Sequence, residues 1–339
     1  MNGTAGTVPR TMTAWCQDRY GGPEAVTEKT VDTPTAGRAE VVLRIRATAL
    51  NAADRHVMRG DPLLLRAAFG LRRPRAATRG MDVAATVVSA GPDVTALAVG
   101  DEVMGELSGG GGLAHYAVSG ADRLVPRPTE LDPLTAATLP LAGGTAWQAL
   151  ELASVAAGER VLVVGASGGV GTFAVQLAAL RGAEVWALCG AHSQELVTGL
   201  GAHRTFDYRE TDAAALPPSS FDAIVDIAAE NRLRTLKTLL RPGGTVVMVG
   251  GEGGRVLGPL GRMLRAVFVS LGGRGRSIRP LAAVAKPEVT RELAALAASG
   301  RIRPVIEHAF GFSEADAALA RIDAGRTVGK VVVQVHMAE

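Results

Sequence analysis

The sequence is poor in cysteine and in aromatic residues, which make up only 4% of its 339 residues. Its two cysteines, Cys16 and Cys189, lie far apart and match neither the spacing of a disulfide framework nor that of a metal site. No run reaches the roughly 18 uncharged apolar residues of a membrane-spanning helix, and residues 1–15 lack the apolar core of a signal peptide. We therefore expect a globular protein in the cytoplasm, without stable insertion into a membrane.

An excess of charge of one sign is also missing. The chain carries 36 lysines and arginines against 33 aspartates and glutamates, and 47% of its residues are hydrophobic. The basic residues are nearly all arginine and are scattered among carboxylates, whereas nucleic-acid binding requires a basic patch. The composition is typical of a globular α/β protein, for which we expect no nucleic-acid partner.

A glycine-rich turn is the most informative feature that is present. Residues 161–164 form an apolar run typical of a buried strand, and apolar residues recur at helical spacing from Val170 onwards. Glycines at this junction let the turn tighten and the backbone approach a pyrophosphate, and the free N–H groups at the helix start attract an anion. The alternative is a plain turn in a glycine-rich chain. We predict a dinucleotide-binding turn formed by Gly165, Ser167, Gly168, Gly169, Val170 and Gly171.

The position of this turn, after about 160 residues, indicates that another domain precedes it. Short alternating runs at 41–47 and 83–89, separated by Gly/Pro/Asp turns, predict a β-rich, barrel-like first domain. Further on, strands alternate with helical patterns, which predicts a doubly wound parallel sheet. Its strands are expected at 161–164, 184–188, 223–226 and 245–249. The last part is expected to return to the first domain, with helices at 292–298 and 314–323 and strands at 305–310 and 330–335.

Short motifs stand along nearly the whole chain in one order, at 20–24, 49–54, 91–94, 99–103, 139–146, the glycine turn, 206–210 and 329–332. Their ordered set resembles the medium-chain dehydrogenase/reductases, in the zinc-independent branch of quinone oxidoreductases, zeta-crystallin and related enoyl reductases. The resemblance implies an α/β protein with a GroES-like β-barrel substrate domain at 1–136 and 284–339. It also implies a Rossmann NADP(H)-binding domain at 137–283 and a homodimer.

The end of the second strand of the Rossmann domain bears on the cofactor. An NAD site usually places a carboxylate on the ribose there, about 20 residues past the glycines. Residues 188–194 contain no acid, so a 2′-phosphate would meet no repulsion. The resemblance implies that Ser193 and Tyr208 contact this phosphate, although serine replaces the lysine often found in relatives. We expect NADPH to bind more tightly than NADH; a simple helix N-cap is the other interpretation of Ser193.

Ligands for a catalytic zinc are missing from the places where zinc-dependent relatives carry them. Asn51 stands in place of the first cysteine, and Gly80-Met81-Asp82 replaces the usual Gly-His-Glu. We therefore expect no metal, and a substrate oxygen held by hydrogen bonds instead.

Three residues are candidates for catalysis. Asn51 can donate its amide to the substrate oxygen or to the cofactor, or it can hold the turn between a strand and a helix. His56 matches a proton-relay histidine of some zinc alcohol dehydrogenases and can supply a proton, although a lone helical histidine is often a surface residue. Thr145 matches a position near the nicotinamide. Asp54 is expected to anchor the helix start.

Further positions are implied by the resemblance alone. Gly250 and Gly251 would let the backbone approach the nicotinamide ring, and Lys330 would contact the cofactor or the domain hinge. An exposed lysine at the start of a strand is the other interpretation of Lys330. The loop at 63–79 offers arginines for a phosphate or carboxylate, or is simply solvated. The segment 258–270 resembles a dimer-contact element.

Together these features predict an NADPH-dependent, zinc-free reductase that transfers hydride to a small hydrophobic quinone or α,β-unsaturated carbonyl. One alternative is an NADP-dependent alcohol dehydrogenase or carbonyl reductase with His56 as proton relay. The other is a non-catalytic nucleotide-binding interaction protein. Short-chain reductases are disfavoured because none of the three tyrosines is followed by a lysine four residues later.

Overall fold

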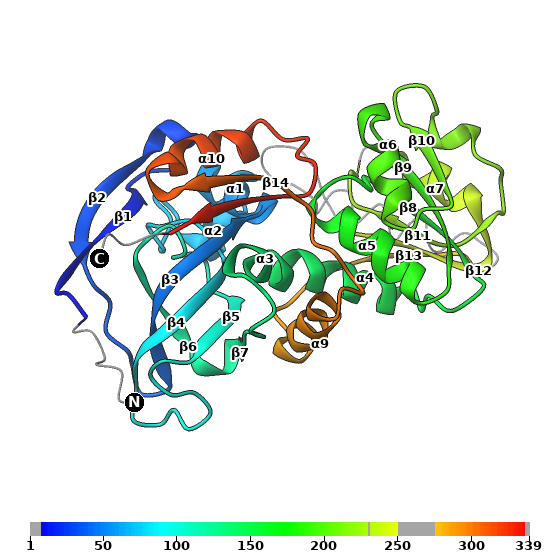
Figure 1. Cartoon of the computed structure of the whole chain (residues 1–339). Helices are drawn as coiled ribbons and strands as arrows, with labels where there is room; N and C mark the ends of the chain where they lie inside the picture. The colour runs from blue at the N-terminus through cyan, green and yellow to red at the C-terminus, as the bar shows by residue number, and fades with distance from the viewer. Residues whose placement is uncertain (1–7, 230, 250–274, 336–339) are drawn as a thin grey trace. The chain divides into compact units, whose positions relative to one another are not determined.

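The computed structural model describes residues 8–229, 231–249 and 275–335, and the chain divides into two compact units (Figure 1). The first unit comprises residues 1–141, 285–300 and 306–339, and the second comprises 142–284 and 301–305. Both ends of the chain thus belong to one unit, and the middle of the chain forms the other. In the described part of the chain, no helix is long and apolar enough to cross a membrane.

The first unit is built on a seven-stranded sheet whose main path has the order β14-β15-β3-β4-β5-β7, with β6 paired to β3. All its pairings are antiparallel except β14 with β15. Its strands are β3 (Glu40–Leu50), β4 (Asp82–Ala90), β5 (Glu102–Glu106), β6 (Tyr116–Gly120), β7 (Leu124–Pro126), β14 (Ile306–Gly311) and β15 (Lys330–Gln334). A separate hairpin contains β1 (Thr11–Gln17) and β2 (Val26–Asp32).

Helix α10 (Ala315–Asp323) covers part of this sheet (Figure 1). Its buried residues Ala315, Ala318, Leu319 and Ile322 recur at helical spacing and pack on a cluster that includes Val331 of β15. The remaining helices are α1 (Ala52–Arg59), α2 (Leu65–Phe69), α3 (Pro133–Ala137) and α9 (Pro287–Ala298), with 3₁₀ turns at Pro23–Ala25, Ala121–Arg123 and Phe312–Glu314. The α9 helix starts five residues before the expected one at 292, because Pro287 fits the first helical turn.

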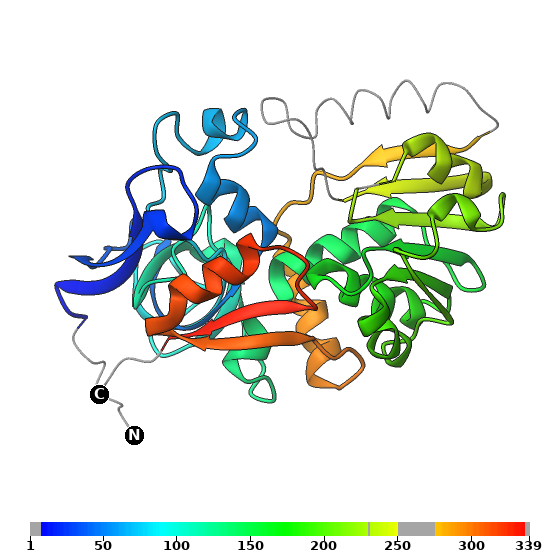
Figure 2. The same cartoon turned by 90° about the horizontal axis from the view of Figure 1, so that it is seen from above.

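The second unit contains a six-stranded sheet in which every pairing is parallel, in the order β10-β9-β8-β11-β12-β13. The strands are β8 (Arg160–Val164), β9 (Glu184–Cys189), β10 (Arg204–Asp207), β11 (Phe221–Asp226), β12 (Leu240–Met248) and β13 (Ser277–Pro280). Figure 2 shows β13 running beside β12 at one edge. The strand order reverses between β8 and β11, and such a reversal is where open α/β sheets bind ligands.

Helices complete the second unit: α4 (Gly144–Leu152), α5 (Gly169–Leu180), α6 (Gln194–Gly199) and α7 (Leu233–Leu239), with 3₁₀ turns at Ala191–Ser193 and Ala213–Ala215. A π-helical turn, Leu139–Gly143, precedes α4. The apolar residues 161–164 of β8 are all buried, as expected for a parallel strand covered on both faces. The predicted doubly wound parallel sheet is therefore confirmed.

Candidate active site

The glycine turn joins β8 to α5 in a conformation that two of its glycines make possible. Gly165 has φ +83°, in the left-handed region that favours glycine. Gly171 allows α5 to lie close to the turn, because a Cβ built there would be 2.2 Å from the carbonyl oxygen of Gly165. The N–H groups of Gly165 and Ala166 both donate to the carbonyl of Leu188 in β9, which holds the turn on the sheet.

The start of α5 is open to a ligand. Thr172 donates its N–H to the carbonyl of Gly168 at 3.0 Å, while the N–H groups that precede it in the helix have no partner within the helix. The side chains at 167 and 170 are half-buried, whereas those from 172 to 178 are buried. The turn therefore presents backbone donors and a positive helix end, which together suit a pyrophosphate.

Ser193 and Tyr208 lie where β9 and β10 end side by side. Ser193 is 1% exposed, and its Oγ has no hydrogen-bond partner among the described residues. Ser193 occupies the N-cap position of α6, but its side chain makes no capping hydrogen bond. Tyr208 is 41% exposed, and its backbone N–H donates to the carbonyl of Cys189 at 3.1 Å.

Arg209 is a functional candidate that the sequence reasoning missed. Its guanidinium lies 4.8 Å from the centroid of the Tyr208 ring, and a Cβ built at Gly190 would be 3.4 Å from its Nη1. The Arg209 side chain is half-exposed, and its Nη1 lies 3.9 Å from Oδ1 of Asp207. The position directly after Tyr208 was the only signal in the sequence, and it gave no reason to prefer this arginine over many others.

In the first unit, Asn51, Asp82 and Lys330 form a buried polar cluster. Asn51 donates from Nδ2 to Oδ2 of Asp82 at 2.9 Å, and its Oδ1 accepts a hydrogen bond from Nζ of Lys330. The Lys330 ammonium also lies 3.6 Å from Oδ2 of Asp82. Lys330 is only 2% exposed, which rules out the interpretation that it is an exposed lysine beginning a strand.

The sheet register brings these residues together. Asn51 follows the last residue of β3, whereas Asp82 and Lys330 are the first residues of β4 and β15. Ala49 pairs with Asp82, and Leu50 pairs with Val331, so the three polar residues meet at one end of the sheet. The backbone N–H of Leu141 donates to the other oxygen of Asp82 at 3.1 Å.

Burial shifts the pKa values of both ionisable groups in this cluster. Burial raises the pKa of Asp82 to about 7, although Lys330 and the hydrogen bond from Asn51 oppose the rise. Burial likewise lowers the pKa of Lys330, with Asp82 opposing. Burial thus disfavours the charged forms of both groups, whereas their mutual attraction favours them.

Asp54 holds the start of α1 next to this cluster. Its carboxylate accepts from the N–H of Asn51 at 2.9 Å and from the N–H of Gly80 at 2.8 Å. Burial raises its pKa, and the nearby Arg79 opposes this. These bonds fix the position of Asn51, in agreement with the structural role expected for Asp54.

The other predicted catalytic residues, His56 and Thr145, take no part in these hydrogen bonds. His56 is half-buried in the last turn of α1, and its Nδ1 donates to the carbonyl of Asp61 at 2.9 Å because a carbonyl oxygen only accepts. This bond leaves Nε2 as the proton acceptor. Thr145 is 7% exposed in α4 of the second unit. Gly250, Gly251 and the segment 258–270 lie outside the described residues.

Among the residues that the structure describes, no group of three or more His, Cys, Asp or Glu side chains could hold a metal ion. In place of such a group, the cluster at the ends of β3, β4 and β15 contains one amide, one carboxylate and one ammonium.

Comparison with known proteins shows which family has this architecture. The family described as alcohol dehydrogenase GroES-like domain matches residues 37–129, and the family described as zinc-binding dehydrogenase matches residues 200–333. A chloroplast envelope quinone oxidoreductase homolog of Arabidopsis thaliana is 34% identical over 335 residues, which cover 95% of this chain and 98% of the relative. A 2-methylene-furan-3-one reductase of Solanum lycopersicum is 31% identical over 343 residues, which cover 97% of this chain and 81% of the relative.

The solved structure of the quinone oxidoreductase from Coxiella burnetii has a TM-score of 0.86 at 26% identity, covering 96% of this chain and all of that one. A GroES-like domain and a parallel dinucleotide-binding sheet define the class, so the expected fold is confirmed. The chain belongs to the quinone oxidoreductase branch of the medium-chain dehydrogenase/reductases. It is an NAD(P)H-dependent oxidoreductase.

Proposed function

We propose that the protein is an NADPH-dependent reductase that transfers hydride to a quinone or an α,β-unsaturated carbonyl without the help of zinc. The observation that carries the proposal is that the chain has both a turn suited to a pyrophosphate and a buried amide, carboxylate and ammonium, with the amide of Asn51 at the position of a missing zinc cysteine. The names of the relatives above, a quinone oxidoreductase homolog and a 2-methylene-furan-3-one reductase, support this substrate class.

The dinucleotide fits the residues of the second unit. A Cβ would fill the close approach at Gly171, and the orphaned hydroxyl of Ser193 is a buried polar atom that a bound phosphate can satisfy. When bound, the reduced nicotinamide supplies the hydride. The start of α5 would hold the diphosphate, and the glycines would keep side chains out of its way.

Preference for NADPH is supported by the charges where β9 and β10 end. Residues 188–194 contain no acid, Ser193 and Tyr208 offer hydroxyls, and the half-exposed Arg209 adds a guanidinium. Guanidinium groups bind phosphate strongly because they pair two N–H donors with two oxygens.

Zinc-free chemistry is supported by the donor set in the first unit. Asn51 and Met81 are poor zinc ligands compared with the cysteine and histidine of zinc-dependent relatives. The Lys330 ammonium instead supplies positive charge, and it orients Asn51 through the side-chain oxygen. In conjugate reduction the negative charge spreads onto oxygen, and the Lys330 ammonium would stabilise that charge.

Replacement of Arg209 by alanine tests the cofactor assignment. Because only NADPH carries the 2′-phosphate, we expect the variant to raise the KM for NADPH by about tenfold and to leave that for NADH unchanged. Steady-state kinetics with both cofactors measures this, and the exposed Arg234→Ala variant on α7 serves as the control. Equal changes for both cofactors would contradict the assignment.

Product analysis with an enone tests the reaction. Reduction of the carbon–carbon double bond is expected, and the ketone should survive. An allylic alcohol as the product would instead favour the carbonyl reductase alternative. The homodimer and the cytoplasmic location stay predictions.

A further inference from the structure

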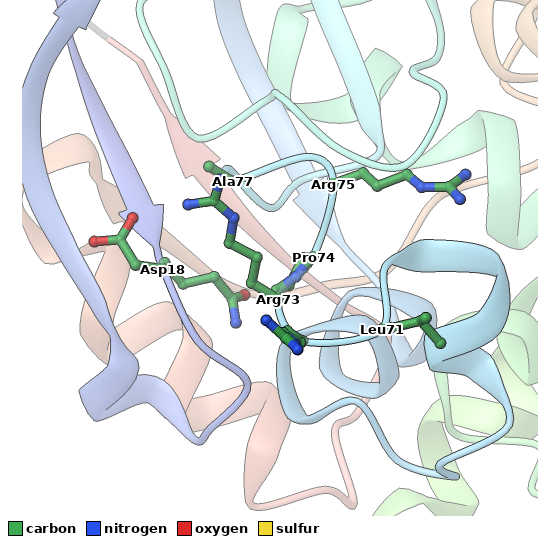
Figure 3. A pocket seen from close by; sticks show the side chains of 8 residues that line it. Asp18, Leu71, Arg73, Pro74, Arg75 and Ala77 are labelled. Carbon is green, nitrogen blue, oxygen red and sulfur yellow. The ribbon is translucent and has the colours of Figure 1, made fainter.

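A pocket of about 500 Å³ lies in the first unit, between the end of β1 and the loop after α2 (Figure 3). This volume falls in the range of small-molecule sites. None of the residues that line the pocket belongs to the glycine turn or to the cluster of Asn51, Asp82 and Lys330. Figure 3 shows Asp18 on one side and Arg73 and Pro74 on the other, with the Arg75 side chain extending away from Asp18.

Positive charge dominates the lining. Arg72, Arg73 and Arg75 are exposed, and none of their side chains forms an ion pair or a hydrogen bond with any residue the structure describes. The only acid in the lining is Asp18, whose carboxylate pairs with Lys29. Lys29, and to a smaller degree Arg73, lowers the pKa of Asp18. Three guanidinium groups are thus left for an anion from outside the chain.

The wall contributed by Gln17 contains an unsatisfied polar atom. Gln17 is 1% exposed, and its Nε2 donates to the carbonyls of Arg19 and Met58 at 2.9 and 3.0 Å. These two bonds fix which end of the amide is which. The remaining atom, Oε1, is buried without a partner among the described residues, and as an acceptor it offers nothing to an anion.

The pocket is held in shape by contacts around it. The Tyr20 hydroxyl donates to the carbonyl of Gly70, and the Arg66 guanidinium lies 4.4 Å from the centroid of the Tyr20 ring. The Gln17 N–H donates to the carbonyl of Ala77 at 2.9 Å, which ties the arginine-rich loop to β1. A preorganised wall lowers the entropy lost on binding.

An apolar surface lies beside the charges. Leu71 is 77% exposed and lines the pocket, whereas Pro74, which also lines it, is buried. A bare inorganic anion would leave this surface and most of the volume unused. A ligand with an apolar part would bury both.

We propose that this pocket binds a small organic anion, with a phosphate or carboxylate head for the arginines and an apolar body for the exposed Leu71. The proposal goes beyond the reductase function and does not depend on it. The two head groups share the chemistry that arginines recognise, so the experiment must separate them.

Calorimetric titration of the full chain with octyl phosphate, octanoate, inorganic phosphate and octanol tests the proposal. We expect one of the two amphiphilic anions to bind at least tenfold more tightly than inorganic phosphate and octanol, and the tighter of the two identifies the head group. Binding is expected to persist when NADPH is present. Competition with NADPH would overturn the proposal, because the anion would then occupy the cofactor's phosphate site.

Variants locate the binding. Arg73→Glu should weaken the tighter anion at least tenfold, whereas Arg234→Glu on the exposed surface of α7, with the same change of charge, should not. Leu71→Ser should weaken octyl phosphate or octanoate but not inorganic phosphate. Both side chains are exposed, so thermal unfolding should match that of the parent. Absence of binding, or equal weakening by both arginine variants, would overturn the proposal.

Discussion

At the scale of single residues, Asp82 has the most unusual environment described above. It is fully buried between an amide, a backbone N–H and the Lys330 ammonium, and its pKa is raised to about 7. Such a group links the stability of the fold to pH.

The sign of this linkage can be predicted. Between pH 3.8, the ordinary pKa of an aspartate, and about 7, the folded chain keeps a proton on Asp82 that the unfolded chain releases. The contribution of Asp82 to the free energy of unfolding is therefore full below pH 3.8 and is lost as the pH rises through 7. We expect the difference between parent and Asp82→Asn to fall by on the order of 4 kcal/mol from pH 4 to 7.5.

Urea denaturation of both proteins across this pH range measures the difference. Two parallel stability curves would show that Asp82 is ionised in the folded chain at all these pH values.

His56 can be separated from its structural surroundings by two substitutions. As a proton donor it would contribute about 10²-fold to kcat, so His56→Phe should lower turnover by that amount. His56→Asn retains an N–H donor for the carbonyl of Asp61 and should lose as much activity, because asparagine cannot supply the proton. Full activity of either variant in a steady-state assay would show that His56 is only a packing or surface residue.

At the scale of elements, our proposal makes dinucleotide binding depend on the turn between β8 and α5. A Cβ at Gly171 would be 2.2 Å from the carbonyl oxygen of Gly165, whereas a Cβ at Gly199 of α6 meets nothing within 4 Å. Gly171→Ala should therefore destabilise the fold by about 1–3 kcal/mol and abolish NADPH binding. Gly199→Ala should be neutral or stabilising by about 0.5–1 kcal/mol. Chemical denaturation and calorimetry check both; equal NADPH affinity in the two variants would contradict the role of the turn.

The elements could be predicted largely from local patterns. The apolar run 161–164 and the glycines after it lie where β8 and α5 are found, and the helix expected at 314–323 is α10 at Ala315–Asp323. The start of α9 was misplaced because the first turn, around Pro287 and Glu288, lacks the apolar periodicity that marked the rest.

The candidate site was less predictable because its contacts are distant in sequence. Asn51 and Lys330 are separated by 279 positions, and only the register of β15 on β3 brings them together. The sequence marked both residues through family motifs but could not show that Lys330 is buried against Asp82. Arg209 was missed because only the meeting of β9 and β10 places it near Gly190.

At the scale of the whole molecule, the proposed binding sites are distributed over both units. By our proposals, the second unit provides a turn for the dinucleotide's phosphates, and the first provides the cluster of Asn51, Asp82 and Lys330 and a separate anion pocket. The similarity to the Arabidopsis thaliana relative extends over 95% of the chain and therefore includes both units.

The most direct test of this account is the rate of NADPH oxidation by the full chain after treatment with a metal chelator, with a benzoquinone and an enone as acceptors. We predict turnover of at least one acceptor, with kcat/KM for NADPH at least tenfold above that for NADH and no increase on adding zinc. Absence of turnover until zinc is restored, or no oxidation of either cofactor under any condition, would contradict it.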